Sequence, residues 1–222
     1  MSGFFSIDNP VWAFIGKLAD VILLNILWFI CCIPIVTIGP STTALYYVTL
    51  KLASDEEGYI CRSFFRAFKT NFKQGTIIWL IMLAIGIIFY VDYSFYLKQV
   101  DLPTTVQNIL YMVFFGMILI YFMVLTYVFP ILSRFDNTIK NTLKNTLLIS
   151  IRHLPWTILI LVITFGLIFL SLTYVPVLLL LGFGLVAFIN SYIFVHIFKN
   201  YMPSEPEERF EILPDLEEIS EE

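Results

Sequence analysis

Four stretches of this chain are long, apolar and almost free of charge. Residues 107–131 and 155–173 carry no charged side chain, and residues 76–97 and 175–198 carry one ionisable group each. As helices rising 1.5 Å per residue, all four are long enough to cross about 30 Å of hydrocarbon. Only 14% of the residues are charged, too few to give such a core a polar surface in water. The sequence therefore predicts an all-α, polytopic membrane helix bundle.

The region before these stretches allows two arrangements. Residues 18–33 predict another membrane helix, and two prolines and a glycine in residues 34–40 end it. A new helix is expected over residues 41–53, about 20 Å long. It crosses the membrane only if neighbouring helices bury its start, which gives six membrane helices. Otherwise it lies in the interface and there are five. Six is favoured, because Lys17 and Lys51 then lie on the same, inner side.

The basic residues predict the orientation. Nine of the thirteen lysines and arginines lie in the loops 51–75 and 133–154. Loop 98–106 carries one base and one acid, and loop 171–175 has no charge. Because bases concentrate on the cytosolic side, both basic loops and the C-terminus are expected inside. With six membrane helices, the N-terminus is cytosolic as well.

Two segments of the basic loops, 60–73 and 136–152, have amphipathic helical patterns. We expect both to lie along the inner leaflet, with their bases toward anionic headgroups. The apolar stripes are Ile60, Phe64, Phe65, Phe68 and Phe72 in the first segment, and Ile139, Leu143, Leu147 and Ile151 in the second. The candidate contact face for a cytosolic partner consists of Arg62, Arg66, Lys69, Lys73, Lys140 and Lys144.

The C-terminal end has a different composition from the rest. Residues 205–222 hold nine acids and one base, whereas the remainder of the chain has an excess of bases. We therefore divide the chain into one transmembrane helical domain, residues 1–204, and an acidic cytosolic tail. The tail is predicted to be disordered through most of its length. Docking on the basic helices at low salt is the alternative.

No catalytic signature is present in the sequence. It has no glycine-rich phosphate loop, no H-E-x-x-H and no G-x-S-x-G. His153 and His196 lack a well-placed carboxylate and make a poor metal site. We expect a non-enzymatic protein with no cofactor, no metal and no nucleic-acid partner, whose immediate surroundings are the lipid bilayer.

A few polar residues within the apolar segments are candidate ligand positions. Asn25 and Asn190 are expected to form hydrogen bonds between helices, worth on the order of 1 kcal/mol each. Asp92, near the outer end of its span, either binds a ligand or reaches toward water. The broken segment 34–43 offers free backbone groups and hydroxyls, although a plain connecting turn is the simpler interpretation. The candidate positions are Asn25, Thr37, Ser41, Thr42, Asp92 and Asn190.

Three segments carry a resemblance to a known family. They are residues 25–28 (NILW), 33–46 (IPIVTIGPSTTALY) and 64–74 (FFRAFKTNFKQ). Over residues 20–80 the chain resembles the bacterial YesL-like family, small membrane proteins with a domain of unknown function. The resemblance implies a Gram-positive-type plasma membrane. Members tend to be encoded near ABC-type sugar transporters and polysaccharide-degrading enzymes, which implies an accessory role in carbohydrate uptake. It supplies no catalytic residues.

Two functional hypotheses follow. The first is a membrane accessory or regulatory protein that contacts subunits of an ABC-type carbohydrate transporter through its basic helices. The second is a stand-alone transporter or channel for a small solute. The second requires a continuous polar path joining Asn25, Asp92, Asn190 and the broken segment 34–43.

Overall fold

The computed structural model describes residues 10–56, 58–97, 103–173 and 177–202, and all regular structure within them is helical. The acidic tail 205–222 and parts of the loops 98–106 and 171–175 lie outside the described residues. The helices are α1 (Pro10–Cys31), η1 (Ile35–Thr37, 3-10), α2 (Ile38–Ala53), α3 (Ile60–Thr70), α4 (Phe72–Val91), η2 (Asp92–Leu97, π), α5 (Thr104–Arg134), α6 (Ile139–Arg152), α7 (Leu154–Thr173) and α8 (Val177–Phe198).

Three described helices are long and apolar enough to cross a membrane. They are Phe72–Ser94, Thr104–Arg134 and Leu154–Thr173, and the stretch Gly182–Phe198 is a shorter apolar helix. Large apolar side chains on them face outward, including Met112 at 78% exposure and Phe169 at 67%. Because so much exposed apolar surface requires an apolar solvent, these helices match a membrane protein. The predicted helical membrane class is confirmed, but the count of six membrane helices is not.

Helix α2 differs from its predicted start. It begins at Ile38 rather than residue 41 and has 16 residues. Pro40 lies in its first turn, where a missing N–H costs no intrahelical hydrogen bond, so this proline does not delay the helix. The start of α2 is buried against α4: a Cβ on Gly39 would lie 2.2 Å from the Gly75 carbonyl oxygen. The neighbours that a crossing α2 requires are therefore present.

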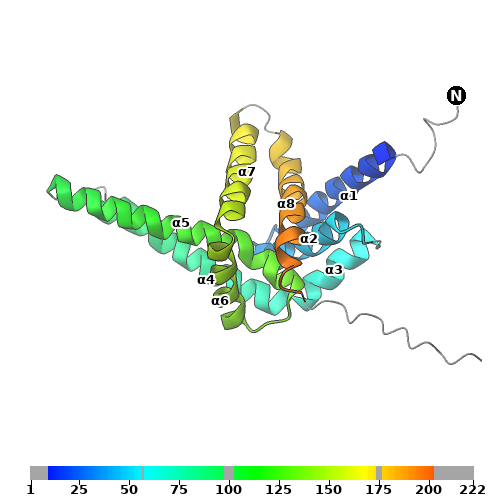
Figure 1. Ribbon diagram of the computed structural model, residues 1–222, viewed down its shortest axis with the longest axis horizontal. Helices are drawn as coiled ribbons and strands as arrows, with labels where there is room; N and C mark the ends of the chain where they lie inside the picture. The colour runs from blue at the N-terminus through cyan, green and yellow to red at the C-terminus, as the bar shows by residue number, and fades with distance from the viewer. Residues whose placement is uncertain (1–9, 57, 98–102, 174–176, 203–222) are drawn as a thin grey trace, which may run out of the picture.

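Two helix pairs diverge from a common body. In Figure 1, α4 and α5 extend together to the left, while α7 and α8 rise side by side. Helix α2 lies at the centre of the body and packs against α1, α3, α4, α5 and α8. Helix α6 extends below α7, from which only His153 separates it (Figure 1).

The buried core lies in this body rather than along the diverging pairs. Its three clusters centre on Tyr127 and Phe194, on Leu24 and Phe64, and on Ile78 with Val128. The outer halves of α4 and α5 carry mostly exposed apolar side chains. The protein-packed residues of these two helices are concentrated near the body, where α2 contacts both.

Candidate functional site

Helices α1, α2, α7 and α8 are joined by buried polar contacts. Gly184 N–H of α8 donates to Asn25 Oδ1 of α1 at 2.8 Å, and the two helices touch closely because a Cβ on Gly184 would lie 2.9 Å from Asn25 Cβ. Asn190 Nδ2 donates to Thr164 Oγ1 of α7 at 3.0 Å. Both asparagines are fully buried. The contacts fit the predicted hydrogen bonding between helices.

The hydroxyls at the chain break contribute to local structure. Thr37 Oγ1 lies 2.6 Å from the Cys31 carbonyl oxygen and 2.7 Å from that of Pro34, so it fastens the turn between α1 and α2. Ser41 lies in the first turn of α2 and is fully buried, and its hydroxyl has no hydrogen-bond partner among the described residues. Thr37 is therefore part of the packed turn before α2, whereas Ser41 belongs to the helix itself.

Thr42, by contrast, faces a cleft. It accepts a hydrogen bond from Trp28 Nε1 at 3.2 Å and donates to the Ile38 carbonyl oxygen at 2.7 Å. The cleft has a volume of about 380 Å³ and is lined by residues of α1, α2, α4, α5, α7 and α8. Tyr46 lines it one turn after Thr42 and lies beside Asn190.

The chemistry of this cleft is apolar with a few uncharged polar groups. Besides Thr42 and Tyr46, it exposes Thr126 and Thr164, and none of the described residues that line it is charged. The indole N–H of Trp79, also in its wall, is buried without an acceptor among the described residues. Such a lining suits an uncharged amphipathic molecule that offers a hydrogen-bond acceptor.

Asp92 is far from this cleft along α4. It begins η2, which packs against α4 and α5 at the end of the pair that extends from the body (Figure 1). Among the described residues, Asp92 has no ion pair. The structure therefore brings Thr42 near Asn190 but leaves Asp92 on a separate part of the fold, so the polar path that the transporter hypothesis requires is not continuous.

Helix α3 presents its bases to the outside. Phe64 and Ala67 are buried against α2, while Arg66 and Lys69 are exposed on the other side. The predicted apolar stripe is therefore divided: its Phe64 edge packs on protein, and Phe65 and Phe72 remain exposed. The two exposed phenylalanines are available to the acyl boundary, as expected of an interfacial helix.

Helix α6 packs on the rest of the protein through a face of mostly small polar side chains. Its buried residues are Thr142, Thr146 and Ser150, with Ile149, whereas Leu147 of the predicted stripe is exposed. Small side chains spaced by four residues let helix backbones approach closely in membranes. Leu147 and Ile151 of the predicted apolar stripe are exposed and so are available to the acyl boundary, where this stripe is expected to lie.

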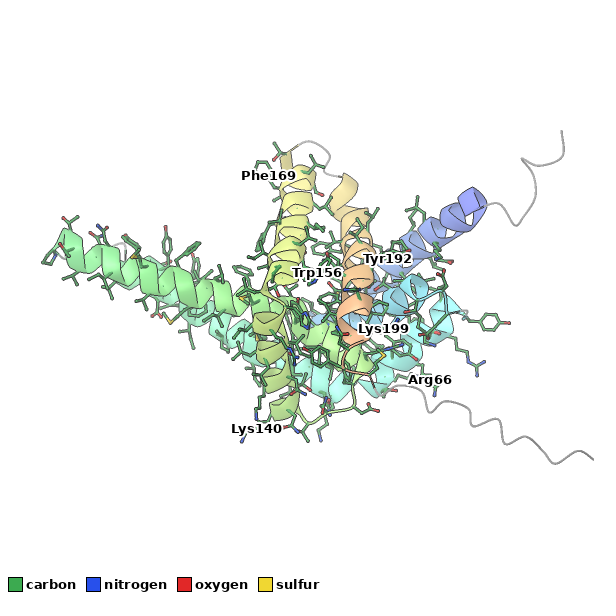
Figure 2. All side chains as sticks on the ribbon, viewed as in Figure 1. Arg66, Lys140, Trp156, Phe169, Tyr192 and Lys199 are labelled. Atoms are coloured by element: carbon green, nitrogen blue, oxygen red, sulfur yellow. The ribbon has the colours of Figure 1, made fainter. Side chains whose placement is uncertain are left out.

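The bases at this end of the body fall into two groups. Lys17 pairs with Asp55, and Glu56 pairs with Lys51 at 3.5 Å and with Arg134 at 2.9 Å. The six candidate contact bases have no ion-pair partner among the described residues. Figure 2 shows Arg66 and Lys140 on the lower side of the body, with Phe169 at its opposite end. The six are Arg62, Arg66, Lys69, Lys73, Lys140 and Lys144.

The two histidines have aromatic neighbours. His153 Nε2 lies 3.0 Å from the Tyr201 hydroxyl, and the His196 ring lies 5.4 Å from that of Trp156. Burial, and then the charges of Arg152 and His196, lower the pKa of His153. Within the described part of the chain, no three histidine, cysteine or carboxylate side chains are grouped to hold a metal ion.

Comparison with known proteins finds a matching family model and similar curated proteins. The model of the family described as "Protein of unknown function, DUF624" matches residues 21–93. The uncharacterized protein YesL of Bacillus subtilis (strain 168) is 28% identical over 188 residues, covering 83% of this chain and 87% of YesL. Over residues 21–93 the chain is similar to the YesL-like family. The uncharacterized protein YteU of the same organism is 27% identical over 159 residues, or 68% of each chain, and no solved structure matches.

The part matched by the YesL-like family model contains several features of the site. Residues 21–93 include Asn25, the crossing of Gly39 and Gly75, the Thr42 side of the cleft and the exposed bases of α3. The resemblance stated on sequence segments is thereby confirmed. The descriptions of the family and of both relatives name no activity.

Sequence reasoning missed several of these residues. In the sequence, Tyr46 and Trp79 look like ordinary apolar or membrane-interface residues. They line one cleft only because six helices come together around it. The buried Thr142, Thr146 and Ser150 had a readable signal, since small residues recur every fourth position. The contact between Arg152, at the end of α6, and Tyr201, in the turn after α8, joins residues distant in the chain and had no such signal.

Proposed function

We propose that this protein is a non-enzymatic accessory or regulatory component of solute uptake. In this proposal its exposed bases on α3 and α6 contact cytosolic subunits of an ABC-type carbohydrate transporter. The observation that supports it is the division of the bases at one end of the body. Three are neutralised by Asp55 and Glu56, whereas the six candidate contact bases have no carboxylate partner among the described residues.

Exposed, unpaired cations contribute little to the stability of the folded chain. They do raise the association rate with an acidic surface and select against basic ones, which is how charged residues commonly serve protein contacts. On α3 the cations lie beside the exposed Phe65, and the exposed Phe72 follows as the first residue of α4. An aromatic edge in the acyl boundary would hold these cations at the membrane surface, within reach of a partner.

The same basic residues indicate on which side of the membrane the contact face lies. Because lysine and arginine concentrate in cytosolic loops, the proposal places α3, α6 and the C-terminus inside the cell. The carbohydrate part of the proposal is supported by the family resemblance alone. An acidic face on a cytosolic subunit is the chemical requirement that the six bases impose on the partner.

Co-purification tests this function. The tagged full chain is purified in mild detergent from cells grown on the inducing sugar, and transporter subunits are quantified by mass spectrometry. We expect them to be recovered with the wild type and to fall several-fold with the double variant R66Q/K69Q. The matched control, T104E/T105E, lowers the net charge equally but changes exposed residues at the far end of α5. Equal recovery with both variants, or no subunits with the wild type, would contradict the proposal.

A second candidate function is transport of a small uncharged solute through the cleft alone, by a route that does not include Asp92. Among the described residues, the buried Trp79 N–H has no acceptor and no charged side chain lines the cleft. This candidate expects uptake of an uncharged solute by proteoliposomes, reduced in Trp79→Phe, which keeps the aromatic ring and removes the donor. Proteoliposomes that take up no more solute than empty vesicles would remove it.

A further inference from the structure

A groove separate from the central cleft lies on α6. It has a volume of about 540 Å³ between the last turns of α5, the outer side of α6 and the chain after α8. Its wall is mostly apolar and includes Ile131, Phe135, Leu148 and Ile151. Polar groups are few, and they come from Asn145, Arg152 and Tyr201.

The arginine of this groove is held in position. Its guanidinium lies over the Tyr201 ring, 5.8 Å from the centroid. The Tyr201 hydroxyl is in turn fixed by His153 Nε2 at 3.0 Å, and the two rings meet edge to face. Arg152 has no ion-pair partner among the described residues. A guanidinium that is positioned by an aromatic ring and lacks a carboxylate is suited to bind an external oxyanion, above all a phosphate.

The apolar part of the groove is open toward the surroundings. Leu148 and Ile151 are 56% and 53% exposed, and the exposed residues Leu154 and Ile158 at the start of α7 follow closely along the chain. Helix α7 is one of the candidate membrane spans, so the groove lies at the end of an apolar, lipid-facing helix. A ligand that covers both parts needs a hydrocarbon chain and an anionic head.

We propose that this groove binds an anionic phospholipid. Its phosphate lies against Arg152, with the Asn145 amide as a second donor, and an acyl chain covers Leu148 and Ile151. Charge complementarity selects an anionic lipid, since the polar end carries an arginine and no acid. This site differs from the nonspecific attraction of anionic lipids to the α3 bases. Binding here requires both the Arg152 guanidinium and the apolar groove.

Native mass spectrometry of the full chain measures this binding. The protein is extracted from nanodiscs of phosphatidylcholine containing phosphatidylglycerol, and retained lipids are counted. We expect phosphatidylglycerol to be retained in preference to phosphatidylcholine, and its apparent affinity to fall about tenfold in Arg152→Gln. Lys140→Gln removes the same charge from the other end of α6, outside the groove, and should lower the affinity much less than Arg152→Gln. Equal losses with the two variants would overturn the proposal.

A second pair of variants tests the apolar part. Leu148→Ser changes a residue of the groove, whereas Leu147→Ser changes an exposed leucine of the same helix outside it. Only Leu148→Ser should reduce retention of phosphatidylglycerol. Glycerol phosphate at equal concentration should not compete, because it lacks the chain; competition would show that the site takes a free phosphate and not a lipid.

Deleting residues 205–222 tests whether this acidic segment, rather than a lipid, occupies the groove. This acidic segment follows Tyr201 closely in the chain and could supply carboxylates to the same arginine. The lipid proposal expects the truncated and full chains to retain phosphatidylglycerol equally. If the full chain retains none and truncation creates the binding, the tail is the occupant and the lipid proposal is wrong.

Discussion

Replacing Gly39 by alanine tests the helix crossing on which the body depends. A Cβ at this position would lie 2.2 Å from the Gly75 carbonyl oxygen and 2.7 Å from Trp79 Cβ, where ordinary contact begins at 3.4 Å. Two helix backbones would therefore have to separate by roughly 1 Å, and such overpacking costs about 1–3 kcal/mol. For a chain of this size, that corresponds to a fall of roughly 2–12 °C in the unfolding midpoint.

The assay is thermal unfolding of detergent-purified protein, followed by size-exclusion chromatography after heating. Gly75→Ala should be milder than Gly39→Ala, because its Cβ would meet Pro40 at 3.0 Å. Gly166→Ala is the matched control: nothing lies within 4 Å of its Cβ, and alanine favours a helix. The reasoning is refuted if Gly39→Ala is as stable as Gly166→Ala, since the close approach of α2 and α4 would then not exist.

Three further predictions concern polar groups. Asn25→Leu should lower the unfolding midpoint modestly, because an interhelical hydrogen bond in a membrane is worth on the order of 1 kcal/mol; an unchanged midpoint would count against it. Glu56→Gln removes two exposed ion pairs and should cost about 0.2–1 kcal/mol at low salt, with the difference disappearing at high salt. Burial, with the charges of Arg152 and His196, lowers the pKa of His153, so the folded chain binds fewer protons than the unfolded one. The free energy of unfolding should therefore fall as the pH drops below 6.5, and it should fall less in His153→Gln. An NMR titration should place the midpoint of His153 below 6.5.

The sequence was a reliable guide to which segments are apolar helices. Apolar runs with at most one charge predicted α4, α5 and α7, and the amphipathic pattern of residues 60–73 predicted α3 with its exposed bases. These features depend on composition and on the helical repeat alone. The start of α2 was less certain because proline is tolerated in a first helical turn, so Pro40 could stand before the helix or within it.

The sequence did not indicate which side of each helix packs on protein. In water, the apolar side of a helix is the side that packs on protein. Lipid tails are as apolar as leucine, so in a membrane the pattern does not separate protein-facing from lipid-facing residues. Helix α6 illustrates this, since Thr142 and Thr146 are buried while Leu147 and Leu148 are exposed.

What the chain determines by itself is therefore its apolar segments, its break before α2 and the bases that border its membrane helices. The tertiary structure decided which polar groups meet. It joined Asn25 to Gly184, neutralised Arg134 through Glu56, and gathered Thr42 and Trp79 around one cleft. These contacts join residues distant in sequence, and their partners follow from how the helices cross, which is set by close approaches such as that of Gly39 and Gly75.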